Sequence, residues 1–129
     1  MPAPFVSAMG IAASGMRAQS TRIRVVAENV ANADTPGYRR KEVAFDELAA
    51  SDPGEVTVKR VFHDLAPLER VYDPGHPLAD AAGYVELSNV NPLIELADLQ
   101  EAHRSYEASL SAFEQARALY QRVLDILRR

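Results

Sequence analysis

The residues of this chain that could do chemistry are three histidines, a set of carboxylates and a few serines. His63 precedes Asp64, His76 lies between two prolines, and His103 falls within a run of helical spacing. A zinc site needs three or four ligands, often with two of them one helical turn apart. The residue one turn before His103 is Leu99, which is no ligand. The spacing therefore favours structural roles for all three histidines.

The carboxylates and serines form no catalytic pattern either. Asp46 with Glu47, and Asp98 with Glu101, have the spacing of solvated faces, and nothing in the sequence brings two carboxylates to one cleft. Three serines fall on one predicted helix, without the strained turn that a nucleophilic serine uses: Ser105, Ser109 and Ser111. The chain has no glycine-rich phosphate loop, and without cysteine it has no thiolate site. We predict that the protein is not an enzyme and that it has no cofactor and no metal site.

The length and composition of the chain predict one soluble domain. The chain has 129 residues, of which 47% are hydrophobic and 25% charged. Residues 1–41 carry six basic and two acidic side chains, residues 42–90 three and ten, and residues 91–129 five and six. The basic first part lacks interleaved aromatic residues, so nucleic-acid binding is not expected. With no run of about 18 apolar residues and no signal-peptide pattern, we expect neither an integral membrane protein nor a cleaved leader.

Residues 1–31 predict the first of two terminal helices. Six apolar residues follow steps of three and four, if Gln19 is allowed as a polar member, and form a narrow stripe: Met9, Ala12, Met16, Ile23, Val26 and Val30. Gly10 and Gly15 each weaken such a helix by about 1 kcal/mol relative to alanine. The same small residues leave room for a neighbouring element to approach closely. This helix is therefore less stable alone but can pack more densely against its neighbours.

Residues 91–129 predict a longer helix that starts with Asn91 as its cap and Pro92 at its first position. Its stripe steps by three and four without a break: Leu96, Leu99, His103, Tyr106, Leu110, Phe113, Arg117, Tyr120, Leu124 and Leu127. The simplest interpretation is that the two terminal helices pair as a coiled coil. The alternative is that each packs on the middle segment. A second stripe widens the apolar face over the last half of this helix: Ala112, Ala116, Leu119, Val123 and Ile126. The wide apolar faces of the two helices favour additional contacts with other molecules.

Residues 32–90 predict an extended arm and a small β-rich segment, which makes the fold class α+β. Three short strands are indicated, within residues 55–64, 67–75 and 83–87, and Pro-Gly turns separate them. Such a segment is too thin to hold a core of its own.

The stretch ANADTPGYRR, residues 31–40, predicts how the first helix ends. Pro36 restricts Thr35 to an extended conformation, and Pro-Gly favours a turn with positive φ at Gly37. Asparagine and aspartate side chains can bind the orphan carbonyls and amides of a helix end, and Tyr38 supplies an apolar anchor with a polar tip. A generic helix stop needs only the proline and the glycine. The additional residues indicate a more demanding local geometry: Asn29, Asn32, Thr35 and Tyr38.

Together, AENVANADTPGYRRKEVAF, VYDPGHPLADAAGYV and NVNPLIELADLQEAHRSYEASLSAFEQARAL carry a resemblance to a known family. The first stretch resembles the signature of the bacterial flagellar axial proteins, the rod and hook family. The other two narrow the resemblance to the proximal rod of the basal body. It covers the chain from about Gly10 onward. Ser109 departs from the pattern, which has asparagine there.

The resemblance implies a structural subunit of the proximal rod that transmits torque and lines an export channel. Its partners would be copies of itself, other rod proteins and the flagellar type III export apparatus, and its location the periplasmic part of the basal body. The terminal helices would form an inner coiled-coil layer, with assembly contacts at Met16, Ile23, Val26, Val30, Leu99, Tyr106, Leu110, Phe113, Tyr120 and Leu124. The family motif would be Asn29, Asn32, Thr35, Pro36, Gly37 and Tyr38. The alternative is a soluble helical-hairpin adaptor or chaperone, which would stay monomeric or form one defined complex.

We expect the terminal helices to be partly disordered in the free monomer, because each exposes its apolar stripe when alone. Amide hydrogen exchange on a dilute monomer should therefore show weak protection of residues 8–30. Strong protection throughout that range would contradict this expectation.

Overall fold

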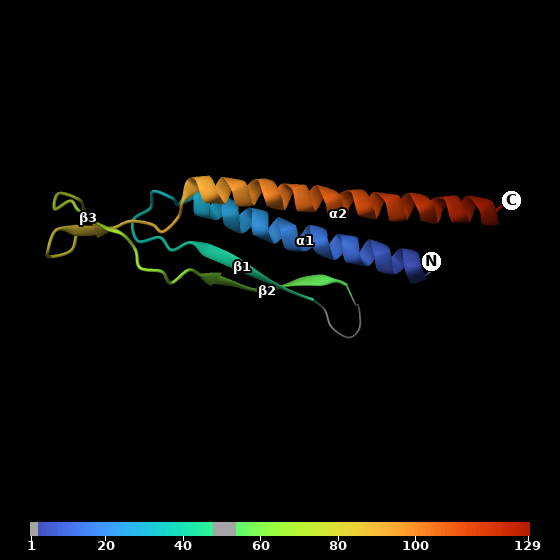
Figure 1. The fold of residues 1–129 in the computed structure, drawn as a ribbon, viewed down its shortest axis with the longest axis horizontal. Coiled ribbons are helices and arrows are strands. Elements are labelled where there is room, and N and C mark those ends of the chain that lie inside the picture. The colour runs from blue at the N-terminus through green and yellow to red at the C-terminus, as the bar shows by residue number, and fades with distance from the viewer. Residues whose placement is uncertain (1–2, 48–53) are drawn as a thin grey trace.

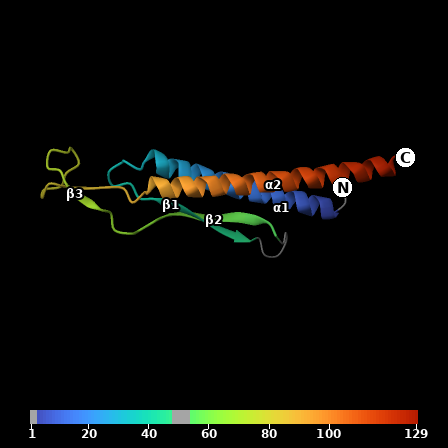
Figure 2. The ribbon, with the colours of Figure 1, turned by 45° about the horizontal axis from the view of Figure 1, so that its top comes forward.

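The computed structural model, which describes residues 3–47 and 54–129, is an elongated three-layered molecule. Two antiparallel helices lie side by side, a β-hairpin runs along one of them, and a second small sheet lies beyond the end of the helix pair (Figure 1). The turned view in Figure 2 shows the same order. The elements are α1 (Ala3–Ala31), β1 (Lys41–Glu47), β2 (Val56–His63), β3 (Arg70–Tyr72), β4 (Tyr84–Glu86) and α2 (Pro92–Leu127). The predicted α+β class and the pairing of the terminal helices are confirmed.

Helix α2 starts as the sequence predicts. The side chain of Asn91 accepts a hydrogen bond from the amide of Leu93 at 3.1 Å, and Pro92 occupies the first turn, where its missing N–H costs nothing. Glu95 is the acidic residue of that first turn. Within the described part of the chain, no helix is long and apolar enough to cross a membrane.

The face of α2 that packs on α1 differs by half from the predicted stripe. Buried and half-buried residues of α2 alternate in steps of four and three and form what we call the helix seam: Glu95, Leu99, Ala102, Tyr106, Ser109, Phe113, Ala116 and Tyr120. The stripe correctly contained Leu99, Tyr106, Phe113 and Tyr120. Its other members include the exposed His103, Leu110 and Arg117, so that half of the prediction was wrong. Ala116 belongs to the second predicted stripe. The other missed seam positions hold small or charged residues, which a search for large apolar side chains passes over: Glu95, Ala102 and Ser109.

Helix α1 is buried on a wider face than its stripe because it lies between α2 and the hairpin. Ala12 and Val26 of the predicted stripe are buried, but so are four residues outside it: Ser14, Ala18, Val25 and Asn29. The hydroxyl of Ser14 donates to the carbonyl of Ile11 at 2.7 Å and accepts from the amide of Val56 at 3.0 Å. A polar side chain thus joins α1 to the start of β2.

The close approach predicted for the small residues of α1 is confirmed at two glycines. A Cβ atom at Gly15 would lie 2.7 Å from the hydroxyl of Ser109 on α2. A Cβ atom at Gly10 would lie 2.7 Å from a carboxylate oxygen of Glu55, next to β2. Each glycine therefore brings α1 close to a different partner.

The strand β1 was not among the three predicted strands, which match β2, β3 and β4. It pairs with β2 in an antiparallel register that shifts between Ala44 and Phe45, where Lys59 is the additional residue of β2. Because neighbouring residues of a strand point to opposite faces, this bulge places Val61 on the same face as Val56 and Val58. The imperfect alternation of the β2 sequence is the signature of that bulge.

The sheet of β3 and β4 forms a short arm beyond the helices (Figure 1). Tyr72 and Tyr84 are cross-strand partners, and their rings meet edge to face with centroids 5.4 Å apart. Gly83 has φ of 87°, and a Cβ atom there would lie 2.9 Å from the ring of Tyr72, so glycine is required on both grounds. Val85 is the buried residue of β4.

Replacing Gly15 by alanine tests the close helix contact. In a Ser109→Ala background the change should raise the free energy of unfolding by about 1 kcal/mol, because alanine favours the helix and the opposing hydroxyl is gone. In the wild-type background the collision with Ser109 should cancel that gain. The measurement is a double-mutant cycle by urea unfolding. An equal gain in both backgrounds would show that α1 and α2 do not touch here.

Candidate functional site

The best-defined polar site of the molecule surrounds Asn29, the fully buried residue near the end of α1. Its side-chain amide donates to the carbonyl of Lys41 at 2.9 Å and to Glu95 Oε2 at 3.3 Å. Its side-chain oxygen accepts from the amide of Lys41 at 3.0 Å and from the hydroxyl of Tyr38 at 2.9 Å. All four hydrogen-bonding positions of the carboxamide are therefore used. One side chain joins the end of α1, the start of β1 and the first turn of α2.

Glu95 is the charged member of this site, with 0% of its surface exposed. Its carboxylate accepts from Asn29 and forms an ion pair with Nε of Arg40, whose Nη1 also pairs with Glu42. A buried carboxylate is tolerated only when it is paired and hydrogen-bonded, and here both conditions hold. We name Asn29, Tyr38, Arg40 and Glu95 the exit cluster.

Two pKa shifts within the exit cluster keep its members in the states that these contacts need. Burial disfavours the charged guanidinium of Arg40, but the hydrogen bonds to Glu95 and Glu42 outweigh it, and the pKa of Arg40 is raised. Burial, assisted by the charge of Glu28, also raises the pKa of Tyr38. The Tyr38 hydroxyl thus stays protonated and can donate to Asn29.

The remaining motif residues form the turn that leads from α1 to β1. Asn32 Nδ2 donates to the carbonyl of Glu28 at 2.9 Å, and the hydroxyl of Thr35 donates to Asn32 Oδ1 at 3.1 Å. Gly37 has φ of 76°, as Pro-Gly predicts, and its amide donates to the carbonyl of Glu86 on β4 at 3.0 Å. The prediction that asparagine and aspartate side chains satisfy the helix end is confirmed for Asn32. Asn29 bonds to the backbone of Lys41 instead, and Asp34 forms no side-chain hydrogen bond with a described residue. Asn29 and Tyr38 are brought together, as are Asn32 and Thr35, and Pro36 is half-buried beside them.

Polar contacts also tie the β3–β4 arm to this turn. Asn89 Oδ1 accepts from the amide of Arg40 at 2.5 Å, and the hydroxyl of Ser88 donates to the carbonyl of Ala33. At the far end of the arm, Asp80 accepts from the amide of Tyr84 at 2.9 Å. That bond, with one from the amide of Ala82 and the pairing with Arg70, lowers the pKa of Asp80. The arm therefore has an ordered base and an ordered tip.

Asp98 and Glu101, expected as a solvated face, instead take part in the helix contact. Both pair with Nη2 of Arg22 on α1, with Glu101 Oε2 at 3.5 Å and Asp98 closer. The side chain of Asp98 is mostly covered, and that of Glu101 is largely exposed. The expectation was wrong for Asp98, because a basic residue of α1 lies opposite it.

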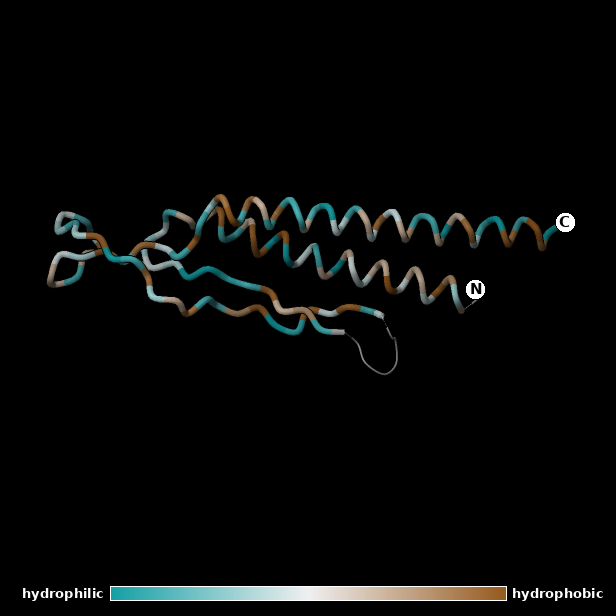
Figure 3. Tube along the Cα trace, in the orientation of Figure 1, coloured by the Kyte–Doolittle hydropathy of each residue, from teal (hydrophilic) through white to brown (hydrophobic). Residues whose placement is uncertain are grey.

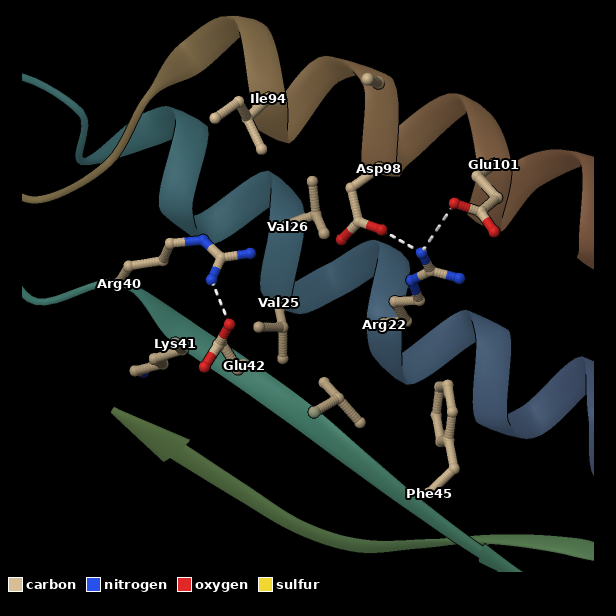
Figure 4. A pocket seen from close by; sticks show the side chains of 12 residues that line it. Arg22, Val25, Val26, Arg40, Lys41, Glu42, Phe45, Ile94, Asp98 and Glu101 are labelled. Atoms are coloured by element: carbon tan, nitrogen blue, oxygen red, sulfur yellow. Dashed lines mark hydrogen bonds and ion pairs between the residues drawn. The ribbon is translucent and has the colours of Figure 1, made fainter. Parts of the chain in front are cut away.

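A groove of about 630 Å³ lies beside the exit cluster, between α1, the start of α2 and β1. Figure 4 shows Val25 and Val26 of α1, Ile94 of α2 and Phe45 of β1 around it, with charged side chains at its edges. Within residues 3–47 and 54–129, no three acidic, histidine or cysteine side chains gather as metal ligands. The site is a groove with both apolar and charged walls, next to the exit cluster.

The predicted assembly residues lie along the two helices with intermediate burial. Val26 is buried and Leu110 is exposed. The other eight are half-buried: Met16, Ile23, Val30, Leu99, Tyr106, Phe113, Tyr120 and Leu124. Tyr120 meets the ring of Phe5 with centroids 5.9 Å apart. Their role in assembly stays a prediction.

Sequence reasoning missed Arg40, Glu95 and Asn89 as parts of the exit cluster and its surroundings. One signal was present for Glu95: it begins a series spaced by seven residues that continues with Ala102, Ser109 and Ala116. A charged residue in a series otherwise made of small side chains indicates a buried partner of opposite charge. The identity of that partner depends on the fold, because Arg40 is 55 positions away.

Two family models match separate parts of the chain. Residues 9–39 match the model described as flagella basal body rod protein, and residues 81–126 match the model described as flagellar basal body rod FlgEFG protein C-terminal. The first match contains most of α1 and the whole turn, and the second contains β4 and nearly all of α2.

Curated relatives match almost the full length. The chain is 47% identical to the flagellar basal-body rod protein FlgC of Agrobacterium fabrum, over 97% of this chain and 96% of the relative. It is 39% identical to the FlgC protein of Salmonella typhimurium, over 90% and 92% of the two chains. It is 37% identical to that of Aquifex aeolicus, over 92% and 94%.

Replacing Arg40 by alanine should lower the free energy of unfolding by about 3 kcal/mol, because the charge of Glu95 would remain buried without its partner. Adding Glu95→Gln should recover part of the loss, since glutamine is neutral and can still accept from Asn29. Urea unfolding with an unchanged m-value is the measurement.

The control is Lys41→Ala, which removes a more exposed ion pair with Glu28 and should cost at most about 1 kcal/mol. If the Arg40 and Lys41 variants lost the same stability, the exit cluster would not be the joint that its geometry indicates.

Proposed function

This chain belongs to the FlgC family of flagellar basal-body rod proteins, and from that premise we propose that it is a structural subunit of the flagellar rod. Full-length similarity to proteins named as rod proteins supports the proposal and does not favour the adaptor alternative. In this role the chain would assemble with copies of itself and with other rod proteins in the basal body.

The observation that carries the proposal in the structure is the amount of apolar surface that one copy leaves uncovered on its helices. Exposed residues occur along the whole of α2: Leu93, Ile94, Leu96, Leu110, Leu119, Ile126 and Leu127. Figure 3 shows hydrophobic positions recurring up to its carboxyl end. Extended apolar surface on a helix pair is typical of a subunit whose neighbours complete its packing.

The mechanical part of the proposal rests on the exit cluster. A rod that transmits torque needs subunits in which the inner helices and the outer segments cannot turn independently. The buried contacts of Asn29 and Glu95 hold α1, β1 and α2 at one point, and leaving any of these polar groups unpaired would cost about 1–3 kcal/mol. The finer proposals are a place in the proximal rod, a lining of the export channel, and delivery by the flagellar type III apparatus without a cleaved leader.

The test is to delete all copies of the coding gene in the source bacterium and to image the cell envelope by cryo-tomography. We expect membrane rings without a rod, and restored rods when the wild-type gene is supplied on a plasmid. Intact rods in the deletion strain would overturn the proposal.

A further inference from the structure

The sheet of β3 and β4 has two outer edges, and its hydrogen bonds show which residues face them. In an antiparallel pair, alternate residues of each strand direct their N–H and C=O groups toward the partner strand, and the residues between them direct theirs away. The amide of Leu87 donates to the carbonyl of Glu69, and the amide of Asp73 donates to the carbonyl of Gly83. The residues whose backbone groups point outward are therefore Arg70 and Tyr72 on β3, and Tyr84 and Glu86 on β4.

The chain closes the outer edge of β4 with its own groups. The side chain of Asp80 accepts from the amide of Tyr84 at 2.9 Å, and the backbone amide of Asp80 donates to the carbonyl of Tyr84 at 2.9 Å. The carbonyl of Glu86 accepts from the amide of Gly37 at 3.0 Å. Three of the four outward groups of this edge thus have partners, so a further strand cannot pair with it.

The outer edge of β3 is open. Within residues 3–47 and 54–129, no group of the chain bonds to the backbone N–H or C=O of Arg70 or Tyr72. All three residues of β3 are exposed, Tyr72 by 64%, and the sheet lies beyond the helix pair (Figure 1). Two backbone donors and two acceptors are therefore unpaired. An open strand edge of this kind is a template for an extended segment of another chain.

The side chains along this edge specify what can pair with it. Glu69 and Asp73 lie at its two ends, both are exposed, and neither forms an ion pair with a described basic residue. Arg70 between them is already paired with Asp80 at 2.5 Å. Because side chains alternate along a strand, Glu69, Val71 and Asp73 point to the same face. The edge thus presents an acidic, an apolar and an acidic side chain at alternate positions.

We propose that the outer edge of β3 binds an extended segment of a different protein, with a basic, an apolar and a basic residue at alternate positions. In antiparallel pairing, the two basic residues would lie opposite Glu69 and Asp73 and the apolar residue opposite Val71, where such cross-strand pairs are favourable. The backbone of the segment would bond to Arg70 and Tyr72. A short edge with charged ends resists strands that lack this pattern.

The sequence of the chain argues against a second copy as the partner. No two lysine or arginine residues among its 129 residues are four positions apart. The nearest match is residues 59–63, which end in a histidine and already form part of β2 in its pairing with β1. The partner is therefore a different protein. The inference goes beyond the proposed function and does not rest on it.

The test is an NMR titration of the isotope-labelled, full-length protein with the peptide TKTVTKT, which has the proposed pattern. We expect saturable shifts of the amide signals of Arg70 and Tyr72, with a dissociation constant on the order of 0.1–1 mM, since only five residues pair. At saturation, hydrogen exchange of these two amides should slow by about tenfold, because both become hydrogen-bonded. No shift of either amide at about 5 mM peptide would overturn the proposal.

Two further peptides separate the role of charge from that of the strand edge. TETVTET reverses the charges and should bind at least about tenfold more weakly, because it repels Glu69 and Asp73. The other is TKTVTKT with N-methyl groups on the two threonines beside the valine. These amides would donate to the carbonyls of β3, so methylation should abolish binding without changing the charge. Binding of either peptide as tight as that of TKTVTKT would overturn the proposal.

Matched variants locate the contact on the protein. Glu69→Gln/Asp73→Asn removes two carboxylates that bond to no described residue, and it should weaken binding of TKTVTKT by about tenfold. Glu86→Gln removes an exposed carboxylate beside the closed edge and should leave the affinity within about twofold of wild type. Equal weakening by both variants would show a general attraction to acidic surface and overturn the proposal. If the double variant loses the spectrum of the folded arm, the N-methylated peptide on the wild-type protein decides.

These outcomes do not depend on the rod assignment. The titration uses purified protein, so its failure would leave the proposed function intact. Intact rods in the deletion strain would count against that function and would not change whether the outer edge of β3 binds the peptide.

Discussion

The carboxamide of Asn29 is the constraint on which the rest of the structure depends. It forms a two-way hydrogen-bonded pair with the backbone of Lys41 and bonds to Glu95, so three segments distant in sequence share one buried point. The direction of β1, the position of the β1–β2 hairpin along α1 and the start of α2 all follow from it. Because no atom of this carboxamide is left without a partner, its geometry permits one arrangement of the three segments and penalises the others.

Between that point and the far end of the helices, small side chains set the spacing and the register. Gly15 lies opposite Ser109 and Asn29 opposite Glu95, so fourteen residues on α1 correspond to fourteen on α2. Ala102 and Ala116 fill the helix seam at intervals of seven from Glu95. Small residues bring the two backbones close, and the large residues of the seam, such as Tyr106 and Phe113, are only half-buried. The close packing of α1 on α2 buries Asn29, while apolar side chains on the opposite face of α2 stay exposed.

The positions of the helices and strands were predicted from the sequence better than the faces that they bury. Asn91, Pro92 and the Pro36–Gly37 turn set boundaries through local chemistry, which is why both helices and the turn were predicted correctly. The helix seam was only half predicted, since burial between two closely packed helices depends on distance and not on hydrophobicity. The pairing of Arg40 with Glu95, and that of Arg22 with Asp98, joins residues dozens of positions apart, and no local pattern encodes such pairs. β1 was missed because its apolar alternation is limited to Val43 and Phe45, and charged residues stand at both ends of the strand.

The order of the segments along the chain has a consequence for how the molecule acquires its structure. The β1–β2 hairpin joins near neighbours in sequence, whereas the contact of Phe5 with Tyr120 closes almost the entire chain into one loop. Contacts of such large sequence separation are slow to form, because the entropy of loop closure is lost before the contact compensates for it. A chain that appears from its amino terminus must wait for residue 95 before Asn29 can complete its bonds. Helix α1 is thus the first element to be made and among the last to become fixed.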